Sequence, residues 1–126
     1  MSIKFTDVCF ITADVLRLRA FYEAVFVGKA EGDEIHSTLG IEGTYFVFMM
    51  EKTPAFYYEM TDGASNMILS FNVDDCDYEY SRLLSLDAEM LNEPTTHPWG
   101  ARSFQFKDPD GNILNFRSFP KEEKPC

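Results

Sequence analysis

The sequence predicts an α+β fold built from two βαβββ modules. Alternation of apolar and polar residues, which is typical of strands, recurs along most of the chain, and two segments have the apolar spacing of a helix. The order of a strand, a helix and further strands occurs twice, in units of roughly 55–60 residues. Phe10–Asp14 and Phe71–Asp75 occupy equivalent places in the two units. The expected division is module one at 4–52, a linker at 53–65, module two at 66–119 and a tail at 120–126.

Module one is expected to begin with a strand at residues 5–12, whose side chains alternate between two faces. Asp14 is expected to cap a helix that runs from Val15 to about Val27 and that Gly28 closes. The helix carries a single apolar stripe, which predicts that one side of it faces a core. The strands predicted after this helix occupy residues 29–31, 35–39 and 44–50.

Module two is expected to repeat this order. A strand at 67–73 precedes Asp74 and Asp75, which are expected to start a helix from Cys76 to about Leu86. Glu93–Gly100 is interpreted as a loop. The remaining predicted strands of this module occupy residues 88–92, 102–107 and 113–119.

The last two strands are expected to form a hairpin around Pro109-Asp110-Gly111. The proline fixes φ at the first turn position, and the glycine supplies the left-handed residue of a bulged three-residue loop. This turn would pair Gln105 with Asn115 and Phe104 with Phe116. One face of the hairpin would then be apolar and the other mostly polar, as a half-buried antiparallel sheet requires.

The composition of the chain limits the classes of molecule that it is expected to bind. The chain has a net charge of −10, which argues against binding to nucleic acid or to anionic membranes and would suit a cationic small molecule, although acidic surfaces more commonly serve solubility. No apolar run is long enough for a transmembrane helix, and the N-terminus does not resemble a signal peptide, so we expect a cytoplasmic protein. The cysteines, Cys9, Cys76 and Cys126, imply neither a disulfide framework nor a zinc knuckle.

Three motifs in this order carry a resemblance to a known family: the helix pattern of Ala13-Asp14, Phe21-Tyr22 and Gly28, then Trp99-Gly100, then Asp108–Asn112. Over about residues 4–119, the chain resembles the vicinal-oxygen-chelate superfamily of glyoxalases, bleomycin-resistance proteins and extradiol dioxygenases. The resemblance implies that each module curls a mixed sheet into a half-cup with its helix on the outer face. It also implies a pocket between the half-cups and a homodimer.

Metal enzymes of this family bind a divalent ion through His, Gln or Glu side chains on the first and last strands of each module. The resemblance places Asp7, about Val47, Ile68 and Asn115 at these positions. None is His or Glu, and a catalytic site needs roughly three good donors. Asp7 remains a possible ligand, but we expect no metal and no other cofactor. The two histidines, His36 and His97, lie outside these positions, in or beside loops.

The residues expected to face the cup favour a site of mixed polarity, as small-molecule pockets usually have. Trp99 is expected either to stack on a flat ring at the rim or to anchor its loop on the core. The aromatic residues 56–58 would cover the sheet, face a dimer partner or touch a ligand. The predicted ligand-binding residues are Asp7, Cys9, Tyr45, Val47, Tyr57, Tyr58, Ile68, Ser70, Trp99, Ser103, Gln105 and Asn115.

Three functions stay open at this point. The first is a non-catalytic small-molecule-binding protein, similar to the acidic, metal-independent bleomycin-resistance branch, which sequesters cationic or planar drugs. The second is a lyase, isomerase or dioxygenase that uses a degenerate metal site or Asp7 as a general base. The third is a partner-binding module with a vestigial pocket, in which residues 56–58 form an interface.

Overall fold

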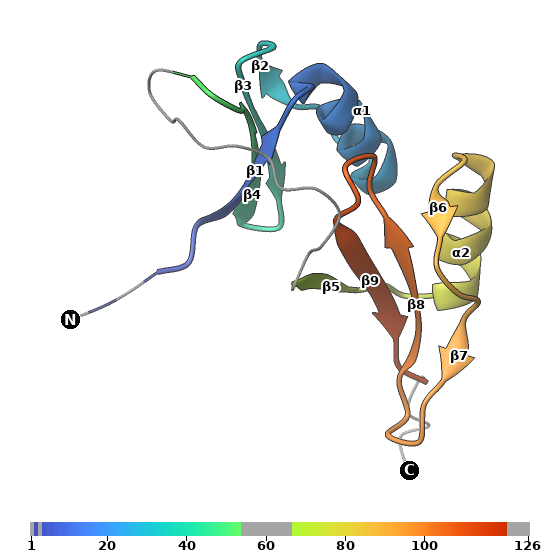
Figure 1. Cartoon of the computed structure of the whole chain (residues 1–126). Helices are drawn as coiled ribbons and strands as arrows, with labels where there is room; N and C mark the ends of the chain where they lie inside the picture. Colours follow the sequence, from blue (N-terminus) through green and yellow to red (C-terminus); the bar gives the residue numbers. More distant parts are fainter. Residues whose placement is uncertain (1, 3, 54–66, 121–126) are drawn as a thin grey trace. The chain divides into compact units, whose positions relative to one another are not determined.

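The computed structural model describes residues 2, 4–53 and 67–120, and the chain divides into two compact units, residues 1–64 and 65–126 (Figure 1). Each unit has one α-helix packed on a mixed sheet, so the predicted α+β fold with two modules is confirmed. Tyr57, Tyr58 and Cys126 lie outside the described residues. No helix in the described ranges is both long and apolar enough to cross a bilayer.

Module one has the predicted element order. Its sheet has the order β1-β4-β3-β2, in which β1 runs parallel to β4 and the other pairs are antiparallel. The helix α1 contacts β3 and β4. The elements are β1 (Asp7–Thr12), α1 (Val15–Phe26), β2 (Glu31–Gly32), β3 (His36–Ile41) and β4 (Thr44–Met50).

Module two repeats the arrangement. Its sheet has the order β5-β9-β8-β6, with β5 parallel to β9, and β7 pairs with β8 beside β6. The helix α2 contacts β8 and β9. The elements are β5 (Ile68–Asn72), α2 (Cys76–Ser85), β6 (Glu89–Met90), β7 (Thr95–Thr96), β8 (Arg102–Lys107) and β9 (Ile113–Ser118).

The hairpin of β8 and β9 has the predicted register and the predicted turn. The N–H of Asp108 donates to the carbonyl of Asn112 (2.9 Å), and the N–H of Gly111 donates to the carbonyl of Asp108 (3.0 Å). Gly111 has a φ of 88°, as a bulged three-residue loop requires. The buried Asp108 carboxylate also accepts hydrogen bonds from the N–H groups of Asp110 and Asn112 and from the Asn112 side chain.

A second turn of the same kind lies inside the segment predicted to be a loop. The N–H of His97 donates to the carbonyl of Ala101 (2.8 Å), and the N–H of Gly100 donates to the carbonyl of His97 (2.9 Å). Gly100 has a φ of 100°. The prediction of an unbroken loop at Glu93–Gly100 was therefore wrong, because this turn joins β7 to β8 as an additional hairpin.

The helix caps are confirmed at their starts but not at the end of α1. The carboxylates of Asp14 and Asp75 each accept an N–H from the first turn of their helix, at 3.1 Å. The left-handed residue that ends α1 is Val27, with a φ of 52°, and not the predicted Gly28. A Cβ on Gly28 would lie 3.0 Å from Leu39 Cδ1, so Gly28 allows close packing of the chain on β3.

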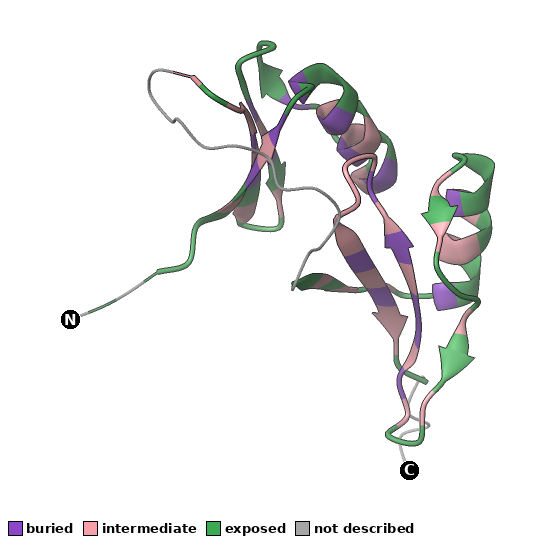
Figure 2. Ribbon diagram, viewed as in Figure 1, coloured by how far each residue is buried: buried purple, intermediate pink, exposed green. Residues whose placement is uncertain are grey.

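Each module has its own aromatic core between helix and sheet. Figure 2 shows buried residues alternating with more exposed ones along the strands, which is the pattern of a half-buried sheet. The buried members of module one include Phe10, Leu18, Tyr22, Phe46 and Phe48. Those of module two include Leu83, Phe104, Phe106, Leu114 and Phe116.

An arginine of α1 fixes the edge strand of module one. The guanidinium of Arg19 donates to the carbonyls of Gly32 (3.1 Å) and Ala30 (3.5 Å) and to Ser37 Oγ (2.9 Å). Glu23, one turn further along α1, accepts the N–H of Ala30 at 2.8 Å. Two helix side chains therefore hold the segment that leads into β2.

An arginine of β8 ties the sheet of module two to its helix. The guanidinium of Arg102 donates to both carboxylate oxygens of Asp77, each at 2.9 Å, and to Thr96 Oγ1 at 3.0 Å. These hydrogen bonds lower the pKa of Asp77 and raise that of Arg102. Both groups are charged at neutral pH.

Candidate ligand-binding site

In module one, the sheet face opposite α1 carries the four site residues predicted there. Because residues directly opposite each other in a sheet share a face, the register puts Asp7 beside Tyr45 and Cys9 beside Val47. Asp7 and Cys9 are exposed, Tyr45 is 50% exposed, and Val47 is partly buried. The predicted grouping of these four residues on one face therefore holds.

The polar groups on this face have little nucleophilic character. Partial shielding of the Cys9 sulfur from water raises the pKa of the thiol, and the nearby Asp7 carboxylate raises it further. The thiol is therefore protonated at neutral pH, and it is the thiolate that reacts. The Asp7 carboxylate accepts a hydrogen bond from Thr6 Oγ1 at 2.7 Å.

In module two, the face opposite α2 carries a row of hydrogen-bonded side chains that we call the amide row: Ser70, Asn115, Gln105 and Asn92. Asn115 donates to Ser70 Oγ (3.2 Å) and accepts from the Gln105 amide. Gln105 in turn accepts from the Asn92 amide, and the Gln105 backbone N–H donates to Asn92 Oδ1 (2.9 Å). The predicted residues Ser70, Gln105 and Asn115 are thus brought together, and each holds the next in place.

Beside the amide row lies a second row, which we call the arginine row: Asn72, Arg117, Ser103, His97 and Trp99. Asn72 Oδ1 accepts from Arg117 Nε (2.9 Å), and Arg117 lies directly opposite Ser103 in the register. His97 Nε2 and Ser103 Oγ are 2.8 Å apart and share a hydrogen bond. The His97 ring stacks on the Trp99 ring, with centroids 4.6 Å apart and planes 3° apart.

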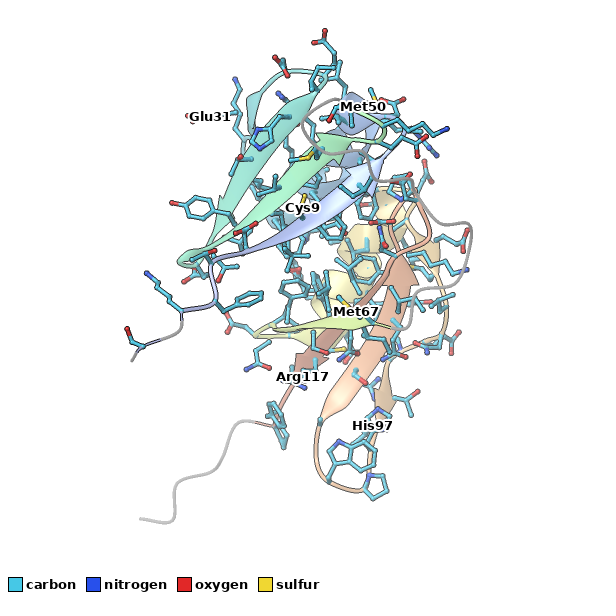
Figure 3. The ribbon with its side chains drawn as sticks, turned by 60° about the vertical axis from the view of Figure 1, so that its left-hand side comes forward. Cys9, Glu31, Met50, Met67, His97 and Arg117 are labelled. Atoms are coloured by element: carbon cyan, nitrogen blue, oxygen red, sulfur yellow. The ribbon has the colours of Figure 1, made fainter. Side chains whose placement is uncertain are left out.

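Figure 3 labels His97 and Arg117 at the same end of the module-two sheet, and Met67 just before β5. Trp99 is 74% exposed, so the interpretation of it as an anchor on the core was wrong. Ser103 is buried, and Ile68, which faces the same side from β5, is 57% exposed. The open face of module two therefore offers a planar aromatic surface at one end and fixed polar groups beside it.

Residues 4–116 match the sequence profile of the Glyoxalase/Bleomycin resistance protein/Dioxygenase superfamily. The chain belongs to this superfamily. The resemblance predicted from the duplicated modules, the Trp99-Gly100 pair and the Asp108–Asn112 turn is confirmed by this match. No curated protein matches the chain.

Several solved structures share the fold of this chain. A glyoxalase/bleomycin resistance protein/dioxygenase from Nocardioides is 18% identical, with a TM-score of 0.80, and the match covers 100% of this chain and 89% of the other. TioX from Micromonospora sp. ML1 is 19% identical, with a TM-score of 0.73 and coverage of 92% and 98%. A lactoylglutathione lyase from Agrobacterium tumefaciens is 16% identical, with a TM-score of 0.73 and coverage of 94% and 95%.

The positions that bind metal in enzymes of the superfamily do not fit a divalent ion in this chain. Val47 and Ile68 have no donor atom, and the Asn115 amide is engaged by Gln105 and Ser70. Asp7 is the one charged donor of the set. In the described ranges, no three His, Cys, Asp or Glu side chains come together in a way that could hold a metal ion.

The sequence interpretation missed Arg117, Asn72, Asn92 and the role of His97. Arg117 follows Asn115 by two residues and so lies on the same face, a signal that the alternation already contained. His97 opens a Pro-x-Gly turn of the same form as the one after Asp108. That turn predicts the hairpin of β7 and β8, which brings His97 to Ser103.

Proposed function

We propose that this chain is a non-catalytic small-molecule-binding protein whose ligand contains a planar ring. The observation that carries the proposal is the open face of module two, where an exposed Trp99 is held parallel to His97 beside the amide row. A flat apolar surface next to fixed hydrogen-bonding groups is a common way to hold a small planar molecule.

The chemistry of the other predicted site residues supports binding without turnover. The donor set at the metal positions of the superfamily is poor, and the Cys9 thiol has a raised pKa. Asp7, the general base of the enzyme hypothesis, is exposed and hydrogen-bonded to its neighbour Thr6. Sequestration of a compound requires binding but no reaction. The superfamily is named in part after bleomycin-resistance proteins, which are a precedent for this function.

We further propose that the protein is a cytoplasmic homodimer, that it uses no cofactor, and that it binds neither nucleic acid nor membranes. The net charge of −10 supports the last part, because phosphate backbones and anionic lipids repel an acidic protein. The homodimer rests on the superfamily resemblance. Sedimentation of the purified protein measures it directly, and a monomer across the micromolar range would contradict it.

Fluorescence of the one tryptophan tests the ligand proposal. Metal-stripped protein is titrated with three nitroaromatic quenchers that share one ring and carry para substituents of different charge: 4-nitrobenzamide, 4-nitrobenzoate and 4-nitrobenzylammonium. We expect saturable quenching by at least one of them without added metal. The same compound should raise the free energy of unfolding, by about 2.7 kcal/mol at a hundredfold excess over its Kd.

Two variants show whether the aromatic surface is responsible. By calorimetry, Trp99→Ala should weaken binding of the same compound by roughly tenfold, since it removes the stacking surface. Tyr78→Ala, which removes another exposed aromatic ring, from α2, is the matched control and should not change binding. If none of the three compounds binds, the proposal is wrong. If binding and turnover occur only with an added divalent metal, the proposal is also wrong and the enzyme hypothesis replaces it.

A further inference from the structure

The charge on the open face of module two is opposite to the charge of the chain. Arg117 and Lys107 are the two charged residues at the outward positions of β5, β9 and β8, where the described residues include no Asp or Glu. Lys107 is paired with Glu89 of β6, with Nζ and Oε2 3.7 Å apart. Within the described ranges, Arg117 has no carboxylate partner.

The guanidinium of Arg117 is oriented but only partly used. Its Nε donates to Asn72 Oδ1 at 2.9 Å, which fixes the plane of the group. In the described part of the chain, its two Nη groups have no hydrogen-bond acceptor. A guanidinium presents its N–H groups in a planar fork that matches a carboxylate, so the end formed by the two Nη groups is suited to an anionic group.

Arg117 is connected to Trp99 through Ser103 and His97. Ser103 lies directly across from Arg117, and side chains at such positions have Cβ atoms roughly 4.5–5.5 Å apart. Ser103 is hydrogen-bonded to His97, and His97 is stacked on Trp99. The arginine row therefore places the cation and the aromatic plane on one face of the sheet, with Ser103 and His97 between them.

We propose that the ligand of this site is an aromatic carboxylate, with its carboxylate bound by the Nη groups of Arg117 and its ring stacked on Trp99. This inference rests on the function proposed above and names the chemical class of the ligand. It differs from the cationic ligand that the net charge suggested, because the arginine row contains the Arg117 guanidinium and no carboxylate. Each side-chain amide of the amide row donates one of its two N–H hydrogens within the row, which leaves the other for the ligand.

The three quenchers already described test the class of ligand, since they share one ring and differ in charge. We expect 4-nitrobenzoate to bind at least tenfold more tightly than 4-nitrobenzamide, and 4-nitrobenzylammonium to bind most weakly. Arg117→Gln should remove the preference for 4-nitrobenzoate over 4-nitrobenzamide. Arg117→Lys, which retains the charge but not the fork, should retain only part of it.

Lys107→Gln is the matched control, because it removes the same charge from the same sheet face where the lysine is already ion-paired. It should preserve the preference for the carboxylate to within about twofold. Circular dichroism of each variant shows whether it is folded. Asn72→Ala is a second variant that tests the role of Arg117. It retains Arg117 but frees its Nε, so it should lower the preference several-fold.

The outcomes separate the two proposals. Equal binding of all three compounds, or a preference for 4-nitrobenzylammonium, overturns the aromatic carboxylate while leaving the planar ligand intact. An equal loss of preference in Arg117→Gln and Lys107→Gln also overturns it, since the effect would then be general electrostatics. Failure of all three compounds to bind overturns both proposals.

Discussion

The two modules share a topology and a buried face but differ on the open face. In both, the first strand is parallel to the last and an aspartate caps the helix. Equivalent open-face positions of β1 and β5 hold Cys9 and Ser70, and those of β4 and β9 hold Val47 and Asn115. Module one therefore presents a weakly polar face, whereas module two presents two hydrogen-bonded rows.

This difference shows that the residues on one face of each strand determine the fold. Successive side chains point to opposite faces, so the core constrains every second residue and leaves the residues between them free to change. Phe48 and Phe116 are both buried at equivalent positions, opposite Phe10 and Phe71 respectively. The structural role is thus common to both modules, and the candidate binding role is concentrated in module two.

The largest expected effect comes from substitutions in the buried face that the two modules have in common. Phe48→Ala and Phe116→Ala should each lower the free energy of unfolding by about 3–5 kcal/mol, because each leaves a cavity in an aromatic core. Urea denaturation followed by circular dichroism measures this loss. Val47→Ala and Asn115→Ala, one residue earlier on the open face, are the controls and should cost about 1 kcal/mol or less. Similar losses at core and open-face positions would contradict the comparison.

A middle-sized effect distinguishes the two Pro-x-Gly turns of module two. Asp108→Ala should lower the free energy of unfolding by about 2 kcal/mol, since a buried carboxylate that accepts three hydrogen bonds is lost. His97→Ala should cost less than about 1 kcal/mol, because backbone hydrogen bonds close its turn. Urea denaturation compares the two variants. Equal losses would mean that the Asp108 side chain adds nothing to its turn.

The smallest effect concerns the ends of the two helices. Val27 adopts a left-handed φ of 52° after α1, and Asp87 adopts a φ of 60° after α2. A β-branched residue is disfavoured there by roughly 1–2 kcal/mol, whereas aspartate is tolerated. Val27→Gly should therefore raise the free energy of unfolding by about 0.5–1 kcal/mol, after the entropy cost of glycine. Asp87→Gly, measured in the same thermal denaturation series, should give no gain.

Much of the fold could be predicted because its signals are local. Asp14 and Asp75 mark the helix starts, and Pro109 with Gly111 fixes the register of the β8–β9 hairpin. The strand β7 was missed because its two residues are too few to show a period. Val27 was missed as the helix end because intrinsic preference favours the neighbouring Gly28.

The candidate site was less predictable because it depends on partners that are distant in sequence. Alternation correctly placed Gln105 and Asn115 on one face, but the Arg117 bond to Asn72 joins residues 45 positions apart. The net charge is a sum over the whole chain, so it could not reveal that the strands around Arg117 carry no acidic side chain on their open face. Local charge follows from topology and not from composition.

The contacts of Arg19 with the segment before β3 have a consequence for association between molecules. The strand β2 forms one edge of the module-one sheet, and edge strands expose backbone groups on which another chain can add a strand. Here the carbonyls of Ala30 and Gly32 and the N–H of Ala30 are already bound by Arg19 and Glu23. Because side chains of α1 bind these backbone groups, this edge is protected from pairing with a strand of another molecule.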